Sequence, residues 1–210
     1  EYAFFPDRLP PPALPLLDFP SLLHPCAVNL NARIMDIYVN KVRVAVCEAG
    51  DDAQYGSSVV ADVNVLQAIS KRVHYGMFVA EAKFRAHEAQ YRALIEAGDE
   101  AGIMALLTDA AVEARVLQRV RRKAETFGQD IEAAEAPASA SRKLDPEAIV
   151  NLYLEHIIPL TKEAEVKYLL QRLGNTRIAY HGSADGCCAA IAAAHAAVAG
   201  VAGAPEAAPA

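Results

Sequence analysis

Two basic residues, Arg72 and Lys83, stand eleven positions apart in a proline-free segment that we expect to form one long helix over about residues 57–85. A helix turns about 100° and rises about 1.5 Å per residue, so the two residues differ by only about 20° in direction and lie about 16 Å apart along the axis. Because unpaired cations are costly to bury, we expect this side to be buried against something anionic. Long side chains leaning toward each other would grip one small anion. The other residues on this side are small or apolar: Ala61, Val65, Ala68, Gly76 and Val79.

The alternative for these two residues is structural. Isolated basic residues on a helix commonly extend to solvent or pair with carboxylates of a neighbouring helix. A different side of the same segment is polar, and an apolar stripe running from Val59 to Phe84 flanks the side of Arg72. The polar side carries Ser70, His74, Glu81 and Arg85.

Three other polar residues are candidates for the same pocket. Glu113 falls in the first turn of an expected helix, where a carboxylate often only favours the helix dipole. Thr161 and Glu165 are four residues apart, hence on one helical face, just after Pro159. A proline frees a carbonyl one turn earlier, and a bend there would build a concavity. The alternative for Thr161 and Glu165 is the solvated face of an ordinary amphipathic helix.

The elements that must position these residues are all helical. No segment shows the alternation of a β-strand, so we expect an all-α fold, a helical bundle built around the long central helix. Residues 1–25 are proline-rich and predict an extended, packed arm. Capping and helix-ending residues predict a helix from Asn31 to near Gly50 and three more over about 88–97, 99–107 and 110–127, the last capped by Thr108 or Asp109. A final helix is expected from Pro146 to about 173, with a kink or break at Pro159.

The domain organisation follows from composition. We expect one domain over residues 1–174, with a flexible connection at 132–143, followed by an alanine-rich, low-complexity tail over 175–210. The chain begins at Glu1 without methionine and without a signal peptide, so we expect a processed or incomplete chain.

Charge and cysteine usage exclude several classes of function. A net charge of −6 without a basic tract argues against nucleic acid as the main partner, and the apolar stretches are too short to span a membrane. Cys26, Cys47, Cys187 and Cys188 show neither metal-ligand nor disulfide spacing, which favours a reducing compartment rather than secretion. The histidines form no metal-binding pattern, so we expect no metal site.

Longer motifs resemble a known family. The segment LQAISKRVHYGMFVAEAKF, residues 66–84, resembles a block of the eukaryotic, all-helical chorismate mutases of plants and fungi. The resemblance covers about residues 4–173, and its LHP and GDD-x-x-YGS elements look more plant- or alga-like than fungal. The other matching segments are LHP (23–25), GDD-x-x-YGS (50–57), AVE (111–113), KAETFG (123–128) and IIPLTKEAEVKYLLQRL (157–173).

The resemblance implies the rearrangement of chorismate to prephenate, without a cofactor, on the route to phenylalanine and tyrosine. Residue by residue, it implies that Arg72 grips a substrate carboxylate, that Lys83 donates to the ether oxygen, and that Glu113 bonds the hydroxyl region of the substrate. Thr161 and Glu165 match a threonine and a glutamate near the carboxylate and the ether oxygen. Val79 and Asp109 are implied as further substrate contacts. The reaction is unimolecular, so catalysis must come from holding the reactive conformer and stabilising charge.

The resemblance also implies regulation and assembly. Gly56 and Ser57 match an allosteric pair for tryptophan and tyrosine at the interface of a homodimer, although glycine followed by serine at a helix start is also ordinary capping. Val60 stands where the fungal pattern has threonine. Family members occur in plastids and in the cytosol, and we expect one of these compartments.

Several departures from the family pattern bear on activity. The family's first helix, with another active-site arginine, has no counterpart, because the chain begins after it. Met77 replaces a usual lysine, which belongs to the flank of the pocket, and Asp109 replaces a frequent asparagine, where an extra anion would weaken chorismate binding. The alternatives are a non-catalytic member that binds aromatic amino acids or pairs with a complete subunit, and an all-helical interaction protein in which Arg72 and Lys83 form structural ion pairs.

Overall fold

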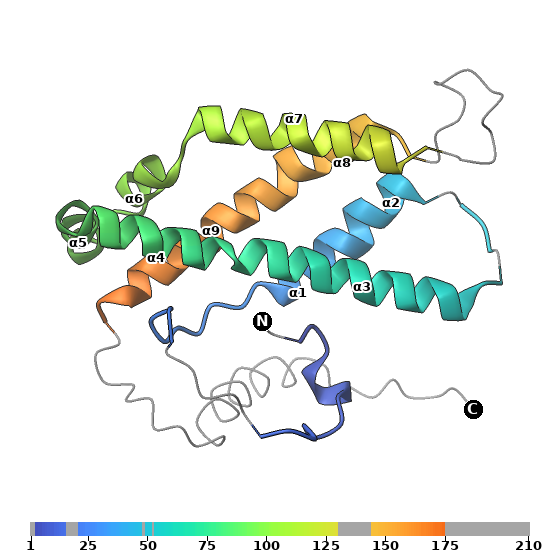
Figure 1. The fold of residues 1–210 in the computed structure, drawn as a ribbon, viewed down its shortest axis with the longest axis horizontal. Helices are drawn as coiled ribbons and strands as arrows, with labels where there is room; N and C mark the ends of the chain where they lie inside the picture. The colour runs from blue at the N-terminus through green and yellow to red at the C-terminus, as the bar shows by residue number, and fades with distance from the viewer. Residues whose placement is uncertain (1–2, 16–20, 48, 52, 130–143, 175–210) are drawn as a thin grey trace, which may run out of the picture. The chain divides into compact units, whose positions relative to one another are not determined.

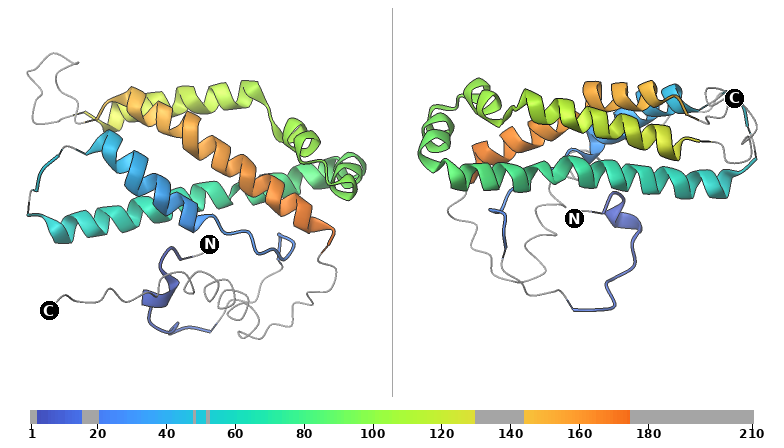
Figure 2. Two further views of the ribbon diagram at one scale, coloured as in Figure 1. Left: turned by 180° about the vertical axis from the view of Figure 1, so that it is seen from behind. Right: turned by 45° about the horizontal axis from the view of Figure 1, so that its top comes forward.

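The computed structural model describes residues 3–15, 21–47, 49–51, 53–129 and 144–174. These residues contain helices and no β-strand, which confirms the all-α prediction (Figures 1 and 2). The chain divides into units of residues 1–174 and 175–210, and every described residue belongs to the first. The expected connection at 132–143 and the alanine-rich tail lie outside the described residues.

The helices lie close to the predicted positions. A short 3₁₀ turn, η1, interrupts the proline-rich arm, and π-helical turns, η2 and η4, lie inside two of the longer helical segments. The bounds are η1 Pro6–Arg8, α1 Asn31–Ile37, η2 Tyr38–Val42, α2 Arg43–Val46, α3 Tyr55–His74, α4 Gly76–Ala86, α5 Glu88–Ala97, α6 Glu100–Leu107, α7 Ala110–Phe127, α8 Pro146–Leu152, η4 Tyr153–Ile157 and α9 Ile158–Arg172.

The predicted long helix consists of α3 and α4, which run almost end to end (Figure 1). Tyr75 separates them, and the Phe78 N–H bonds the Tyr75 carbonyl, a tighter i to i+3 pattern. The backbone of Tyr75 stays in the right-handed helical region, so the direction of the axis is largely kept. α9 crosses this pair and packs chiefly against α4.

The last helical segment contains a π-helical turn just before Pro159. Proline has no N–H to donate, and the preceding residues form the π-helical η4, in which the Ile158 N–H bonds the Tyr153 carbonyl. Such turns relieve strain in a helix and often occur near functional sites. The kink or break expected at Pro159 is therefore a local widening one turn earlier, and α9 continues to Arg172.

The prediction of which side of the long helix is buried was wrong. Arg72 is exposed and Lys83 is only partly buried, whereas Ser70, His74 and Glu81 of the polar side are buried among apolar residues. The reason is that these polar groups have partners, which offset their desolvation. The buried apolar residues on the same side of α3 and α4 are Leu66, Val73, Met77, Ala80 and Phe84.

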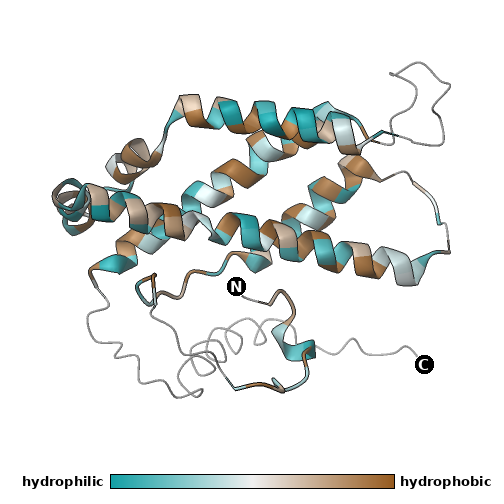
Figure 3. Ribbon diagram, viewed as in Figure 1, coloured by the Kyte–Doolittle hydropathy of each residue, from teal (hydrophilic) through white to brown (hydrophobic). Residues whose placement is uncertain are grey.

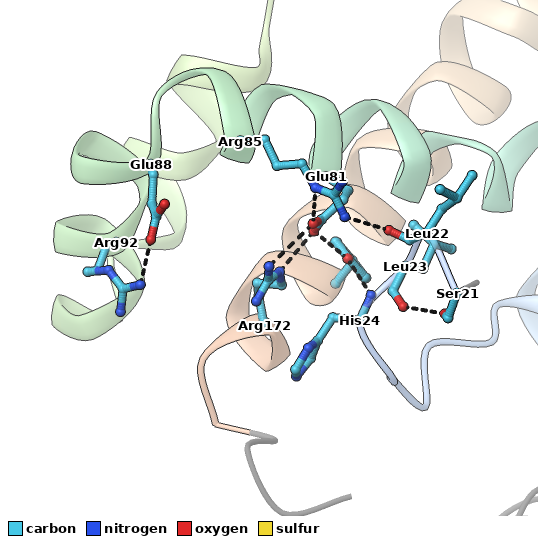
Figure 4. A network of polar contacts seen from close by, with 10 residues as sticks. Ser21, Leu22, Leu23, His24, Glu81, Arg85, Glu88, Arg92 and Arg172 are labelled. Carbon is cyan, nitrogen blue, oxygen red and sulfur yellow. Dashed lines mark hydrogen bonds and ion pairs between the residues drawn. The ribbon is translucent and has the colours of Figure 1, made fainter. Parts of the chain in front are cut away.

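A network of polar contacts surrounds the buried Glu81 (Figure 4). Its carboxylate accepts hydrogen bonds from the Tyr168 hydroxyl at 2.6 Å and from Arg172 Nε at 2.9 Å, both from α9, and from Arg85 Nε at 2.7 Å. The arm joins the cluster, because the His24 N–H donates to the Tyr168 hydroxyl at 3.0 Å and Arg85 donates to the Leu22 carbonyl. Glu81 therefore fastens α4 to α9 and to the arm.

The first half of α3 carries apolar residues that no other described element covers. Apolar residues occur along the whole of α3 (Figure 3), yet Val59, Val60 and Val63 near its start are exposed. The stripe predicted from Val59 to Phe84 is therefore buried only in its second half. Among the helices of the described residues, none has both the length and the apolar composition that crossing a membrane requires.

Candidate active site

The candidate site lies where α9 meets the junction of α3 and α4. Gly76, the first residue of α4, has no side chain, and Thr161 and Glu165 of α9 fill the space beside it. Both side chains are more than nine-tenths buried, at 8% and 7% exposure. The prediction that these two residues share a face is therefore right, and the face is buried rather than solvated.

Glu165 is at the electrostatic centre of the site. Burial raises its pKa to about 7, because desolvation disfavours the carboxylate. The positive charges of Lys83, Arg72 and Lys162 act in the opposite direction and only partly offset burial, while the negative charge of Glu113 raises the pKa further. Three of the other predicted catalytic residues, Arg72, Lys83 and Glu113, thus act electrostatically on Glu165. The fourth, Thr161, lies one helical turn from Glu165 against the same glycine.

Two of the site's polar groups are held by backbone carbonyls. Lys83 donates from Nζ to the Leu107 carbonyl at 2.5 Å, which ties α4 to the end of α6. The hydroxyl of Thr161 donates to the Ile157 carbonyl at 2.7 Å, in the π-helical turn before Pro159. This hydrogen bond to the backbone four residues earlier holds the rotamer of the β-branched Thr161.

Arg72 borders a groove of about 160 Å³ between α3 and the η4 turn. The groove is otherwise apolar, and the guanidinium is the charged group among its lining residues. The remaining lining residues are Val65, Ala68, Ile69, Leu152, Tyr153 and Ile157. An exposed cation beside an apolar groove suits a ligand that carries both a carboxylate and a hydrophobic ring.

The other predicted residues lie in less central places. Val79, implied as a substrate contact, is 48% exposed on α4. Asp109 is the N-cap of α7, and its Oδ1 accepts from the N–H groups of Ala111 and Val112 at 3.0 Å each. Its carboxylate is thus engaged in capping, which is the ordinary role of aspartate at that position. Gly56 and Ser57 lie exposed in the first turn of α3.

Two further residues of the candidate site were not predicted as site residues. Lys162 places its Nζ 2.7 Å from Glu113 Oε1, so it links α9 to α7 and neutralises a site carboxylate. Lys162 directly follows Thr161 in the sequence, and a basic residue next to a candidate site residue could have indicated its role. Gly76 is the second, and an isolated glycine inside a helical pattern is itself a sign that something approaches closely.

The arrangement is suited to binding an anion and stabilising developing charge. It combines two cations from α3 and α4 with a buried carboxyl whose pKa of about 7 leaves much of it protonated at neutral pH. Of these groups, Arg72 is the one that also lines the apolar groove. Within the described ranges, no cluster of three or more His, Cys, Asp or Glu side chains is placed to hold a metal ion.

Comparisons with known proteins place this site in a family. Residues 55–166 match the family model of chorismate mutase type II, and these residues include Gly76 and every predicted catalytic residue. The chloroplastic chorismate mutase 1 of Petunia hybrida is 45% identical over 177 residues, which cover 82% of this chain and 55% of that protein. The chain thus spans little more than half the length of that relative.

Solved structures share this helical fold. The Aro7p chorismate mutase of Candida albicans, in complex with L-Trp, superposes with a TM-score of 0.74 at 39% identity, covering 83% of this chain and 66% of that one. AtCM1 with tyrosine bound in its allosteric site superposes with a TM-score of 0.72 at 42% identity, covering 82% and 68%. Since the sequence motifs, the helical arrangement and the family model all agree over the same residues, this chain belongs to the chorismate mutase type II family.

Proposed function

We propose that this chain catalyses the rearrangement of chorismate to prephenate. The observation that carries the proposal is the convergence of Lys83, Arg72 and the buried Glu165 at the place where α9 meets the α3–α4 junction. Family membership supports the same reaction, which would serve the synthesis of phenylalanine and tyrosine.

The proposed mechanism needs no cofactor and no nucleophile. In this rearrangement the ether C–O bond of chorismate breaks while a C–C bond forms within the same molecule, and no proton is gained or lost. The protein must therefore hold the compact conformer and stabilise negative charge that develops on the ether oxygen. Binding a dicarboxylate in a partly buried pocket also requires cations that offset its desolvation.

The chain's own residues would divide these tasks. Arg72, exposed beside the groove, would bind one substrate carboxylate. Lys83 and protonated Glu165 would donate to the ether oxygen, and Thr161 would orient the adjacent carboxylate. Glu113 is paired with Lys162 in the structure. Once Lys162 also interacts with the ligand, Glu113 would accept a hydrogen bond from the substrate hydroxyl. Val79 and Asp109 would line the rim of the same site.

The test is the loss of chorismate absorbance catalysed by the 210-residue chain and by three variants. Arg72→Ala and Lys83→Ala should each lower kcat/KM by about 100-fold or more, since each removes a preorganised charge from the transition state. Arg92→Ala is the matched control, because Arg92 is an exposed arginine of α5 paired with Glu88. It should keep the activity of the parent chain.

Absence of turnover in the parent chain would contradict the proposal. Thermal protection by chorismate or by a transition-state analogue would then distinguish a binding protein, which is protected, from an interaction protein, which is not. Equal losses in Arg92→Ala and Arg72→Ala would also count against a specific role of Arg72.

Regulation and assembly belong to the same proposal. We infer that Gly56 and Ser57 contribute to a site for tryptophan or tyrosine at the interface of a homodimer. They are exposed at the start of α3 beside the uncovered Val59, Val60 and Val63, and the structures of relatives contain L-Trp or tyrosine, the latter in an allosteric site. Activity measured with each amino acid, alongside light scattering of the chain and of Ser57→Ala, tests both parts. A monomer that is indifferent to both amino acids would contradict them.

The compartment is part of the proposal as well. We propose the plastid or the cytosol, and the chloroplastic relative from Petunia favours the plastid. Cys26 and Cys47 are free thiols, which fits a reducing compartment.

A further inference from the structure

Gly76 occupies a place that has no room for a larger residue. A Cβ atom at this position would lie 2.7 Å from Thr161 Cγ2, 3.0 Å from Glu165 Cγ and 3.1 Å from Glu165 Oε1. Carbon atoms in proteins pack at about 3.5–4.0 Å, so the first of these contacts is impossible without movement. The two side chains that would be displaced are the two that α9 contributes to the candidate site.

Backbone conformation does not account for this glycine. Gly98, which ends α5, has a φ of +66° and needs glycine for that reason, whereas Gly76 lies outside the left-handed region. Inside a helix, glycine is less favourable than alanine because it loses more conformational freedom. Glycine at position 76 therefore serves to leave space for the side chains of α9.

The neighbouring side chains have little freedom to yield. Thr161 is β-branched and is held by its hydrogen bond to the Ile157 carbonyl at 2.7 Å, so a rotation of its side chain would break that bond. Glu165 is buried as well, at 7% exposure. The remaining response to a methyl group at position 76 is a displacement of α9 from the α3–α4 junction, which would move Glu165 relative to Lys83 and Arg72.

We propose that Gly76 is a positioning residue for the rearrangement, because its lack of a side chain sets the distance of Thr161 and Glu165 from the basic residues of α3 and α4. This inference rests on the proposed function and adds to it the residue that fixes the site's geometry. Gly76 itself would not touch the reacting atoms.

The kinetic test compares Gly76→Ala with the parent chain. We expect kcat to fall about 10- to 100-fold, the effect of a small misplacement of reacting groups, with a smaller change in KM. Ile34→Val, a core variant in α1 and outside the candidate site, controls for a general loss of thermal stability. A parent-like kcat in Gly76→Ala, or a similar loss in Ile34→Val, would overturn the proposal.

A double-mutant cycle tests the contact itself. Thr161→Ser keeps the hydroxyl but removes the Cγ2 methyl that meets the new Cβ at 2.7 Å. The loss caused by Gly76→Ala should therefore be several-fold smaller in the Thr161→Ser background than in the parent. If Gly76→Ala alone folds poorly, the double variant, in which the clash is relieved, still allows the contact to be tested. Equal losses in both backgrounds would overturn the proposal.

A third measurement does not depend on turnover. The titration of the Glu165 carboxyl can be followed by ¹³C NMR, with Glu165→Gln identifying its resonance. The charged and titratable groups that act on it come from four helices: Arg72, Lys83, Glu113 and Lys162, and the buried Tyr91 of α5 responds to Glu165 in turn. A displaced α9 changes burial and these distances together, so the midpoint should shift in Gly76→Ala. An unchanged midpoint would contradict positioning by Gly76, whereas a parent chain without turnover would contradict only the proposed reaction.

Discussion

Lys162 of α9 lies with its Nζ 2.7 Å from Glu113 Oε1 of α7, so a carboxylate of the candidate site is already paired with a cation before any ligand arrives. Both side chains are partly exposed, at 23% and 31%. A pair in such a position contributes little to stability, because solvent screens it. Its importance lies in how it balances the charge around Glu165.

Removing either partner of this pair should shift the titration of Glu165, and in opposite directions. The charge of Lys162 lowers the pKa of Glu165, and the charge of Glu113 raises it. Lys162→Met should therefore raise the titration midpoint of Glu165, and Glu113→Gln should lower it. NMR titration of the Glu165 carboxyl measures both, and shifts of the same sign would contradict the arrangement.

The pH dependence of activity should follow Glu165. Burial raises its pKa to about 7, so the carboxyl is largely protonated below that pH and able to donate to the substrate's ether oxygen. We expect kcat to fall as pH rises through about 7 and expect Glu165→Gln, which donates at every pH, to give a flatter profile. Initial rates between pH 5.5 and 9 test this, and an equally steep profile in Glu165→Gln would assign the titration to another group.

Stability should respond to the same residue with a definite sign. The folded-state pKa of Glu165 lies above the ordinary value of 4.5 for a glutamate, so the folded protein binds the proton more tightly than the unfolded chain. The favourable contribution is complete below about pH 4.5 and is lost as pH rises to about 7 and beyond. Urea denaturation should show that the parent loses stability relative to Glu165→Gln over this range, and a constant difference would contradict a buried carboxyl.

The fold was largely predictable from the sequence, because the helix boundaries depend on local signals. Asp109 and Asp145 cap α7 and α8 with their side chains, and Gly98 ends α5 with a positive φ. The buried side of α3 and α4 was not predictable in this way. Ser70, His74 and Glu81 are buried because each has a partner distant in sequence, and helical periodicity carries no information about such partners. The partners are Asn31 of α1, Leu30 immediately before α1, and Tyr168 of α9.

The candidate site residues were named from helical spacing and from motifs, but the surroundings of their side chains could not be predicted in that way. Arg72 and Lys83 were expected on a buried side, yet Arg72 is exposed beside a groove and Lys83 bonds the Leu107 carbonyl. Position 76 was noted only as a small residue on that side. That glycine matters because Thr161 and Glu165, some 85 residues later, pack against it.

The buried cluster around Glu81 should dominate the stability of the α4–α9 contact. Burial opposes ionisation of Glu81, but hydrogen bonds from Arg172, Tyr168 and Arg85 outweigh it and hold the pKa of this carboxyl below its usual value. Glu81→Gln removes the charge and leaves Arg172 half-buried without a carboxylate. We expect a loss of about 2–4 kcal/mol in the free energy of unfolding at pH 7.

A matched control for Glu81 lies on the neighbouring helix. Glu88 pairs with Arg92 in α5, but both side chains are about half exposed (Figure 4). Glu88→Gln should cost less than about 1 kcal/mol, because exposed pairs are screened. Since the pKa of Glu81 is depressed, the advantage of the parent over Glu81→Gln should shrink as pH falls below about 4.5. Similar losses for the two variants would contradict the central role of Glu81.

His74 should make the attachment of Leu30, at the start of α1, sensitive to acid. Its Nε2 accepts a hydrogen bond from the Leu30 N–H at 3.0 Å, and its Nδ1 lies 2.8 Å from the Ser70 carbonyl. The first bond requires an unprotonated Nε2, so the ring must be neutral with its proton on Nδ1. Burial lowers the pKa of His74 in accord with this geometry, although the Ser70 carbonyl acts in the opposite direction.

The sign of the pH effect follows from that depressed pKa. The unfolded chain binds a proton near pH 6.5 and the folded protein only at lower pH, so stability is complete above about 6.5 and falls as the solution is acidified. Glu165 acts in the opposite direction over this range, so the comparison should be made in a Glu165→Gln background. Adding His74→Leu there should cost about 1–3 kcal/mol at pH 7.5, because the Leu30 N–H loses its acceptor. The same change should reduce the stability lost between pH 7.5 and 5.5, as measured by urea denaturation. An undiminished acid sensitivity would show that another group is responsible.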